Sequence, residues 1–160
     1  MNRVKIILIL IMIILGVTGL ILSKNKKMEN YEIAQKNLET KIVLYFSDLE
    51  TGKLTKEYRY VDINSIKENT AGTIINELLK GPNTEGLVSS VPYGTKVKSI
   101  KEEGDKIEID FSKEYSGGSG DELQNLHKIY SVVNSLTEIT EINEVEIKVE
   151  GKTITNKVRL

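Results

Sequence analysis

The stretch that organises the chain runs from residue 96 to residue 115 and reads KVKSIKEEGDKIEIDFSKEY. In its second half Ile107, Ile109 and Phe111 alternate with polar residues, which is the period of a strand with one buried and one wet face. Just before them, Gly104 can adopt the positive φ that the first central position of a type II′ turn requires. Residues 96–115 therefore predict a β-hairpin.

The first arm of this hairpin is less regular than the second. Val97 and Ile100 fall on opposite faces of a flat strand, which predicts a β-bulge or an early strand end. On each side of the hairpin the sequence carries a helix signal with clear end points. These two helices and the hairpin define the expected centre of the fold.

The first helix is predicted over residues 69–80. Asn69 or Thr70 can cap its start, and Gly81 followed by Pro82 ends it. Glycine readily takes the left-handed conformation after a helix, and proline cannot continue the hydrogen-bond ladder. Its core-facing stripe is expected to comprise Ala71, Ile74, Ile75, Leu78 and Leu79.

The second helix is predicted over residues 121–138, where Ser119 and Glu122 have the spacing of a capping box. Its apolar face is expected to comprise Leu123, Leu126, Ile129, Tyr130, Val132, Val133, Leu136 and Thr137.

Three more strands complete the prediction, at residues 42–46, 57–63 and 144–150. The tail after Gly151 could add an edge strand. The order strand, strand, helix, hairpin, helix, strand predicts an α+β fold, in which two helices pack on a small, mostly antiparallel sheet.

An unbroken apolar run, Ile6 to Leu22, precedes this domain. With its flanks it is long enough to cross a bilayer as a helix, for which about 20 residues are needed. No small-residue cleavage pattern follows the run, which favours an uncleaved transmembrane helix over a signal peptide. Basic residues flank both ends, so charge does not fix the orientation. The very short amino-terminal side predicts a single-pass cell-membrane protein with a cytoplasmic N-terminus and an extracytoplasmic domain.

The chain is thus expected to consist of an anchor at residues 1–27, a stalk at 28–41 and a folded domain at 42–160. Five of the 22 basic residues lie in the anchor, which leaves 17 against 23 acidic residues and a net charge of −6 beyond it. This acidic balance argues against binding to nucleic acid. The absence of cysteine excludes disulfide bonds and acylation of a cysteine.

No motif in the chain predicts catalytic residues, a cofactor or a metal site. The glycine-rich residues 116–120 lack the spacing of a phosphate-binding loop. His127 and Asn134 are interpreted as structural residues that hydrogen-bond to nearby backbone, because no second histidine, cysteine or ordered acid accompanies them. Adjacent acids such as Glu102 and Glu103 point apart rather than across a substrate, so a hydrolase is the least favoured class.

Six short motifs follow one another along the folded domain: LYFSD at 44–48, LLKGP at 78–82, VPYGT at 91–95, DFSKEY at 110–115, YSVVNSLT at 130–137 and VEG at 149–151. Over about residues 42–151 their order and spacing resemble the GerMN domain of sporulation and spore-germination proteins. The resemblance implies a ring-building-motif-like α/β sandwich, an extracytoplasmic location in sporulating or other Gram-positive bacteria, and no known catalytic residues. The best-known members are lipoproteins with two such domains, whereas this chain carries one such domain and no cysteine.

Two functions from different classes are compatible with the sequence. The first is a non-enzymatic assembly or scaffold module, tethered to the membrane, that binds envelope or sporulation proteins. The second is a domain that binds cell-wall glycan, such as peptidoglycan, or a small ligand, by stacking on exposed Tyr45, Tyr58, Tyr60 or Tyr93. For Tyr58 and Tyr60 the favoured interpretation is half-buried sheet packing with the hydroxyl at the surface.

Overall fold

The computed structural model describes residues 3–36, 38–118, 121–138, 141–155 and 158–159. The chain divides into two compact units, Met1–Glu39 and Thr40–Leu160. The capping position predicted at Ser119 lies outside the described residues.

The first unit is one long helix, α1 (Arg3–Lys36), so the helix continues through most of the predicted stalk. Its described side chains, those of residues 12–28, are all exposed. Within the described part of the chain, no helix is both long enough and apolar enough to cross a membrane. The predicted membrane-spanning run at residues 6–22 lies partly outside the described side chains and stays a prediction.

The second unit has an α+β fold, as predicted, but it contains two sheets and not one. The three-stranded sheet has the order β2-β1-β3, with β1 at Glu39–Asp48, β2 at Leu54–Asp62 and β3 at Leu87–Val88. The prediction of one sheet was wrong because pairing between strands distant in sequence leaves no local signal.

The five-stranded sheet contains the predicted hairpin. Its path is β4 (Val97–Glu103), β5 (Lys106–Phe111), β6 (Glu144–Val149) and β7 (Lys152–Thr153), and β8 (Val158–Arg159) also pairs with β6. The register shifts between Val97 and Ser99, and Gly104 has a φ of 66°, so the irregular first arm and the glycine turn are confirmed. β5 and β6 are parallel, which makes this sheet mixed.

The first predicted helix is preceded by a separate short helix. α2 spans Ile63–Glu68, and α3 spans Thr70–Leu79. Asn69 separates them, because its side chain accepts a hydrogen bond of 2.7 Å from the Gly72 amide and caps α3. Gly81 has a φ of 82°, which confirms the predicted helix end.

The second predicted helix is α4 (Glu122–Thr137), which follows the 3-10 turn η1 (Lys113–Ser116). Its N-cap is Asp121, whose carboxylate accepts a hydrogen bond of 3.1 Å from the Leu123 amide, whereas the prediction placed the cap at Ser119, outside the described residues.

The buried face of α4 is also rotated relative to the prediction. Leu123, Leu126 and Tyr130 are exposed, while Lys128 and Ser131 are buried. Lys128 reaches the core because its aliphatic stem packs inside while its ammonium lies 5.3 Å from the Tyr115 ring centroid.

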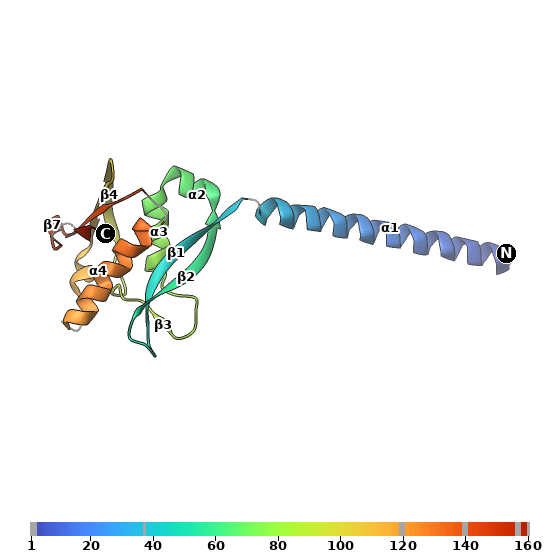
Figure 1. Cartoon of the computed structure of the whole chain (residues 1–160). Coiled ribbons are helices and arrows are strands. Elements are labelled where there is room, and N and C mark those ends of the chain that lie inside the picture. Colours follow the sequence, from blue (N-terminus) through green and yellow to red (C-terminus); the bar gives the residue numbers. More distant parts are fainter. Residues whose placement is uncertain (1–2, 37, 119–120, 139–140, 156–157, 160) are drawn as a thin grey trace. The chain divides into compact units, whose positions relative to one another are not determined.

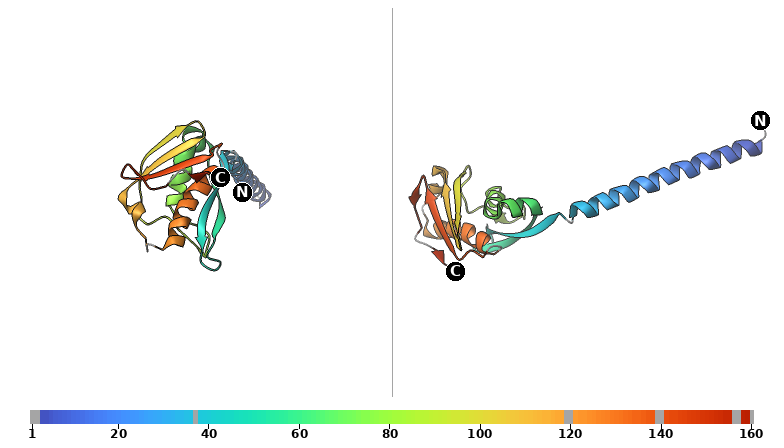
Figure 2. Two further views of the ribbon diagram at one scale, coloured as in Figure 1. Left: turned by 60° about the vertical axis from the view of Figure 1, so that its left-hand side comes forward. Right: turned by 90° about the horizontal axis from the view of Figure 1, so that it is seen from above.

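Figure 1 and Figure 2 show α3 and α4 side by side, with the five-stranded sheet on one side of them and the β1–β2 hairpin on the other. One apolar core joins β1, α3, β5, α4 and β6. The exposed surface of each sheet is therefore the face turned away from the helices.

Candidate functional site: a tyrosine face on the first sheet

The exposed face of the β1–β2 hairpin carries three tyrosines and two lysines. Alternation along β2 buries Glu57, Arg59 and Val61 and turns Lys56, Tyr58 and Tyr60 outward. β1 contributes Lys41 and Tyr45 to the same face, because Lys41 contacts the Tyr58 ring and Lys56 contacts the Tyr45 ring. We call these five residues the tyrosine face: Lys41, Tyr45, Lys56, Tyr58 and Tyr60.

Contacts between the two strands hold this face together. The Lys41 ammonium lies 4.6 Å from the Tyr58 ring centroid, and that of Lys56 lies 5.6 Å from the Tyr45 ring centroid. Tyr58 and Tyr60 are 59% and 65% exposed, so the interpretation of half-buried packing was wrong for both. Large aromatic side chains exposed in a row on a rigid sheet are suited to contact a partner.

One corner of the tyrosine face is polar. The Tyr45 hydroxyl donates a hydrogen bond to the Glu138 carboxylate, which also forms an ion pair with Lys56. Burial and this hydrogen bond raise the pKa of Tyr45, and the hydrogen bond from Lys56 lowers the pKa of Glu138. At neutral pH this corner therefore carries the neutral phenol of Tyr45, the carboxylate of Glu138 and the ammonium of Lys56.

An open hollow of about 420 Å³ lies beside this corner, lined by Tyr45, Asn134, Thr137 and Glu138. The Thr137 hydroxyl donates to the Val133 carbonyl, at 2.9 Å. No hydrogen bond from the Asn134 side chain to described backbone is present, so the predicted structural role is not supported for Asn134. Asn134 is instead one of the residues that line the hollow.

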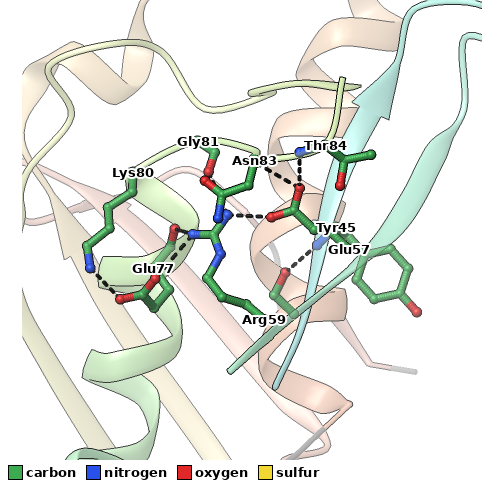
Figure 3. A network of polar contacts seen from close by, with 9 residues as sticks. Tyr45, Glu57, Arg59, Glu77, Lys80, Gly81, Asn83 and Thr84 are labelled. Atoms are coloured by element: carbon green, nitrogen blue, oxygen red, sulfur yellow. Dashed lines mark hydrogen bonds and ion pairs between the residues drawn. The ribbon is translucent and has the colours of Figure 1, made fainter. Parts of the chain in front are cut away.

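A buried polar network supports the tyrosine face from below (Figure 3). Arg59 Nη1 donates to the Glu77 carbonyl at 2.8 Å, and its Nη2 donates to the Gly81 carbonyl at 2.8 Å and to the Glu57 carboxylate. Glu57 also accepts hydrogen bonds of 2.8 Å from the Asn83 and Thr84 amides. The network thus ties β2 to the end of α3 and to the loop that follows it.

Electrostatics keep both acids of this network ionised. Burial by itself would raise the pKa of Glu57, but the hydrogen bonds from Arg59 and from the two amides bring it below its usual range. For Glu77 burial is likewise outweighed, by the hydrogen bonds from Lys80 and Arg59, and its pKa is lowered. Arg59 is therefore buried with compensating negative charge.

Two serines of α4 fix the other edge of β1. The Tyr45 amide donates to Ser135 Oγ at 3.0 Å, and Ser131 Oγ donates to the Tyr45 carbonyl at 2.6 Å. Both serines are fully buried. Their sequence signal was a pair of hydroxyl residues four positions apart, Ser131 and Ser135, next to the apolar residues Val132 and Leu136.

His127 joins three segments through side chains. Its Nδ1 lies 3.0 Å from Ser47 Oγ, which lies 2.8 Å from Ser90 Oγ. The predicted hydrogen bond from His127 to nearby backbone was wrong, because the partner of the ring is the Ser47 side chain. Within the described residues no carboxylate hydrogen-bonds to this ring.

Tyr93 does not belong to the tyrosine face. It is fully exposed at a turn and lines a separate groove of about 380 Å³ with residues that include Gly81, Ser90 and Gln124. The described residues contain no cluster of His, Asp or Glu side chains that could hold a metal ion.

Comparison with solved structures shows the same fold elsewhere. The first GerMN domain of the sporulation protein GerM from Bacillus subtilis matches with a TM-score of 0.58 and 20% identity, covering 76% of this chain and 93% of that chain. The tandem GerMN domains of the same protein match with a TM-score of 0.58 and 23% identity, covering 72% and 40%. A candidate lipoprotein from Clostridium perfringens matches with a TM-score of 0.51 and 22% identity, covering 76% and 87%.

The sequence itself matches a family model over most of the folded domain. Residues 43–155 match Germane, described as sporulation and spore germination, while no curated protein matches the chain. This confirms the resemblance to GerMN domains that the six motifs indicate. The chain therefore belongs to the Germane family of sporulation and spore germination.

Proposed function

We propose that this chain is a membrane-anchored, extracytoplasmic and non-enzymatic assembly module that binds other cell-envelope proteins during sporulation or spore germination. The family is described by these processes and not by a reaction. The observation that carries the proposal is the tyrosine face, where Tyr58 and Tyr60 are 59% and 65% exposed on the strand β2. Tyrosine is enriched at the energetic centres of protein interfaces.

The anchor part of the proposal rests on the apolar run at residues 6–22. The apolar side chains described there, from Met12 to Leu22, are exposed on all sides of α1. Apolar surface of this kind is stabilised by lipid or by another protein, and basic residues on both flanks suit the bilayer surface. Envelope proteins are therefore the partners within reach of the domain.

Affinity capture of the full-length chain from membranes of sporulating and of growing cells tests the proposal. We expect a reproducible set of envelope proteins, with at least about tenfold lower recovery for the double variant Tyr58→Ala and Tyr60→Ala. The matched control is Tyr93→Ala, which removes an exposed tyrosine outside the tyrosine face. Equal recovery of envelope proteins by the wild type, the double variant and the control would contradict the assignment of the tyrosine face as the binding surface.

Peptidoglycan binding is the second candidate, favoured by the hollow that Tyr45, Asn134 and Glu138 line. A ring, an amide and a carboxylate around one open hollow are groups that can stack on and hydrogen-bond to sugar rings. Its test is sedimentation of the full-length protein with purified peptidoglycan, comparing wild type with Tyr45→Ala and Asn134→Ala. Saturable micromolar binding that these changes abolish, with no protein recovered by capture, would replace the first proposal by this one.

A further inference from the structure

The outer edge of β2 is an open strand edge. β2 is the outermost strand in the order β2-β1-β3, and it runs for nine residues, Leu54–Asp62, without proline or glycine. Apart from its pairing with β1, no backbone hydrogen bond from another described segment reaches these residues. Figure 1 shows β2 beside β1 with no labelled strand on its other side. Such an edge is a template for pairing with another strand.

The other strand edges of the described fold are protected. β4 carries charged Lys98, Lys101, Glu102 and Glu103 and a register shift after Val97. β3 and β7 are two residues long, and α4 covers the β1 edge through Ser131 and Ser135. Short strands, charges, irregularities and covering helices are the usual protections of sheet edges. β2 carries charges as well, but it is nine residues long and pairs with a described strand on one side only, which distinguishes it from the other edges.

We infer that β2 pairs antiparallel with β2 of a second copy of this chain, with Tyr58 opposite Tyr58 at the two-fold axis. This register uses all nine residues and sets Glu57 opposite Arg59 and Lys56 opposite Tyr60. Moving the axis by one residue in either direction would set Arg59 opposite Arg59 or Glu57 opposite Glu57. Since like charges directly opposite each other destabilise a sheet, the charge pattern of β2 selects the register centred on Tyr58.

The pairing joins the two three-stranded sheets into one. Both tyrosine faces then lie on the same side, because paired residues in an antiparallel register share a face. The inference rests on the proposed function in one respect: anchoring in one membrane plane supplies the local concentration that a weak strand pairing needs. One partner of the assembly module is thus a second copy of this chain. The pairing doubles the surface that is offered to envelope proteins.

The natural absence of cysteine makes a cross-linking test free of background. In the proposed register, Tyr58→Cys places two thiols directly opposite, with Cβ atoms about 4.5–5.5 Å apart, which small movements bring into disulfide range. Tyr60→Cys is the matched control, because it changes the same residue type on the same face. Its two thiols would be offset by four residues, about 13 Å along the strands, and cannot bond.

Full-length Tyr58→Cys in membranes is expected to form disulfide-linked dimers under mild oxidation, and Tyr60→Cys is expected to remain monomeric. Equal cross-linking at both positions would indicate random collision or face-to-face stacking and would overturn the pairing. Absence of dimers from both variants, with wild-type melting temperatures, would overturn it as well. If envelope proteins are captured but the Tyr58→Cys variant does not cross-link, the pairing fails and the proposed function stands. If the Tyr58→Cys variant cross-links but no envelope protein is captured, the strand pairing stands and the proposed function fails.

A second measurement does not depend on disulfide geometry. Tyr58→Lys places two like charges opposite each other at the axis and should weaken dimerisation of the full-length protein in detergent by about fivefold. Tyr93→Lys adds the same charge away from β2 and should leave dimerisation unchanged. Sedimentation analysis of the three proteins measures the difference, and equal self-association of all three would contradict the inference.

Discussion

At residue scale, the side chains of Ser131 and Ser135 form the hydrogen bonds to the Tyr45 backbone that a neighbouring strand would otherwise form. Their hydroxyls bond the Tyr45 carbonyl at 2.6 Å and its amide at 3.0 Å. Ser135 also donates to the Ser131 carbonyl at 2.7 Å, so its oxygen serves both elements. These contacts explain physically why hydroxyl residues occupy buried positions of the YSVVNSLT motif. Sequence periodicity could predict the helix but not these bonds, because the partner lies about ninety residues away in the chain.

Replacing Ser135 by alanine should lower the free energy of unfolding by about 1–3 kcal/mol, because the Tyr45 amide loses its partner. The gain in helix propensity from alanine is smaller, at most about 0.7 kcal/mol. Thermal unfolding of the full-length protein in mild detergent measures the effect. Ser99→Ala, an exposed serine of β4, is the control and should change stability by less than about 0.5 kcal/mol. A loss no larger than that of the control would show that the serine bond to β1 contributes little.

At the scale of elements, the Arg59 network holds β2, α3 and the loop after α3 in one arrangement. The alternation of side chains along a strand puts Arg59 and Val61 on one face of β2, and the structure buries both. The sequence did not indicate that Glu57 and Glu77 compensate the charge of Arg59, because those contacts join segments that are distant in the sequence.

The apolar face of α4 was also misplaced, because contacts with distant segments decide which of its residues are buried. Lys128, Ser131 and Ser135 are buried through specific partners, while Leu123, Leu126 and Tyr130 remain exposed.

This network predicts a dependence of stability on pH. The pKa values of Glu57 and Glu77 are lowered in the folded protein, so the folded state binds fewer protons than the unfolded state in acid. Their stabilisation is complete above the ordinary glutamate pKa of about 4.3 and is lost as pH falls through the lowered folded values. Glu57→Gln should therefore be less stable at neutral pH and lose less on acidification. Urea midpoints between about pH 6 and pH 3 measure this slope.

Glu85→Gln is the matched control for the acid series, because Glu85 is exposed in the loop near the network. The control should retain the wild-type slope. If the urea midpoint of Glu57→Gln changes with pH as that of the wild type does, the Arg59 network does not cause the loss of stability in acid.

At the scale of the whole molecule, the sequence predicted the class and the family, and the structure added how the strands are arranged. The hairpin, the end of the first helix and the α+β class depend on local period and turn chemistry, so they were predictable. The division into two sheets and the parallel pairing of β5 with β6 depend on contacts between distant segments. The tyrosine face follows from the same arrangement, since it needs β1 and β2 to be neighbours.

The proposed membrane anchor at residues 6–22 is tested by fractionation. Full-length protein should remain in the membrane fraction at high salt, and protease added outside should digest the folded domain. Leu15→Arg combined with Leu20→Arg should release the protein, since each central arginine disfavours insertion by about 2.5–3.5 kcal/mol. A soluble product beginning near residues 23–28 would instead show that the run is cleaved.

The most direct test of the central claim is site-specific photocross-linking in cells that make the full-length chain. A photoreactive phenylalanine analogue at Tyr60 should give covalent adducts with envelope proteins other than this chain, most abundantly during sporulation. The same analogue at Tyr93 samples an equally accessible tyrosine outside the tyrosine face and should give few adducts. Equal adducts at both positions, or adducts with peptidoglycan alone at Tyr60, would contradict the claim that the tyrosine face binds protein partners.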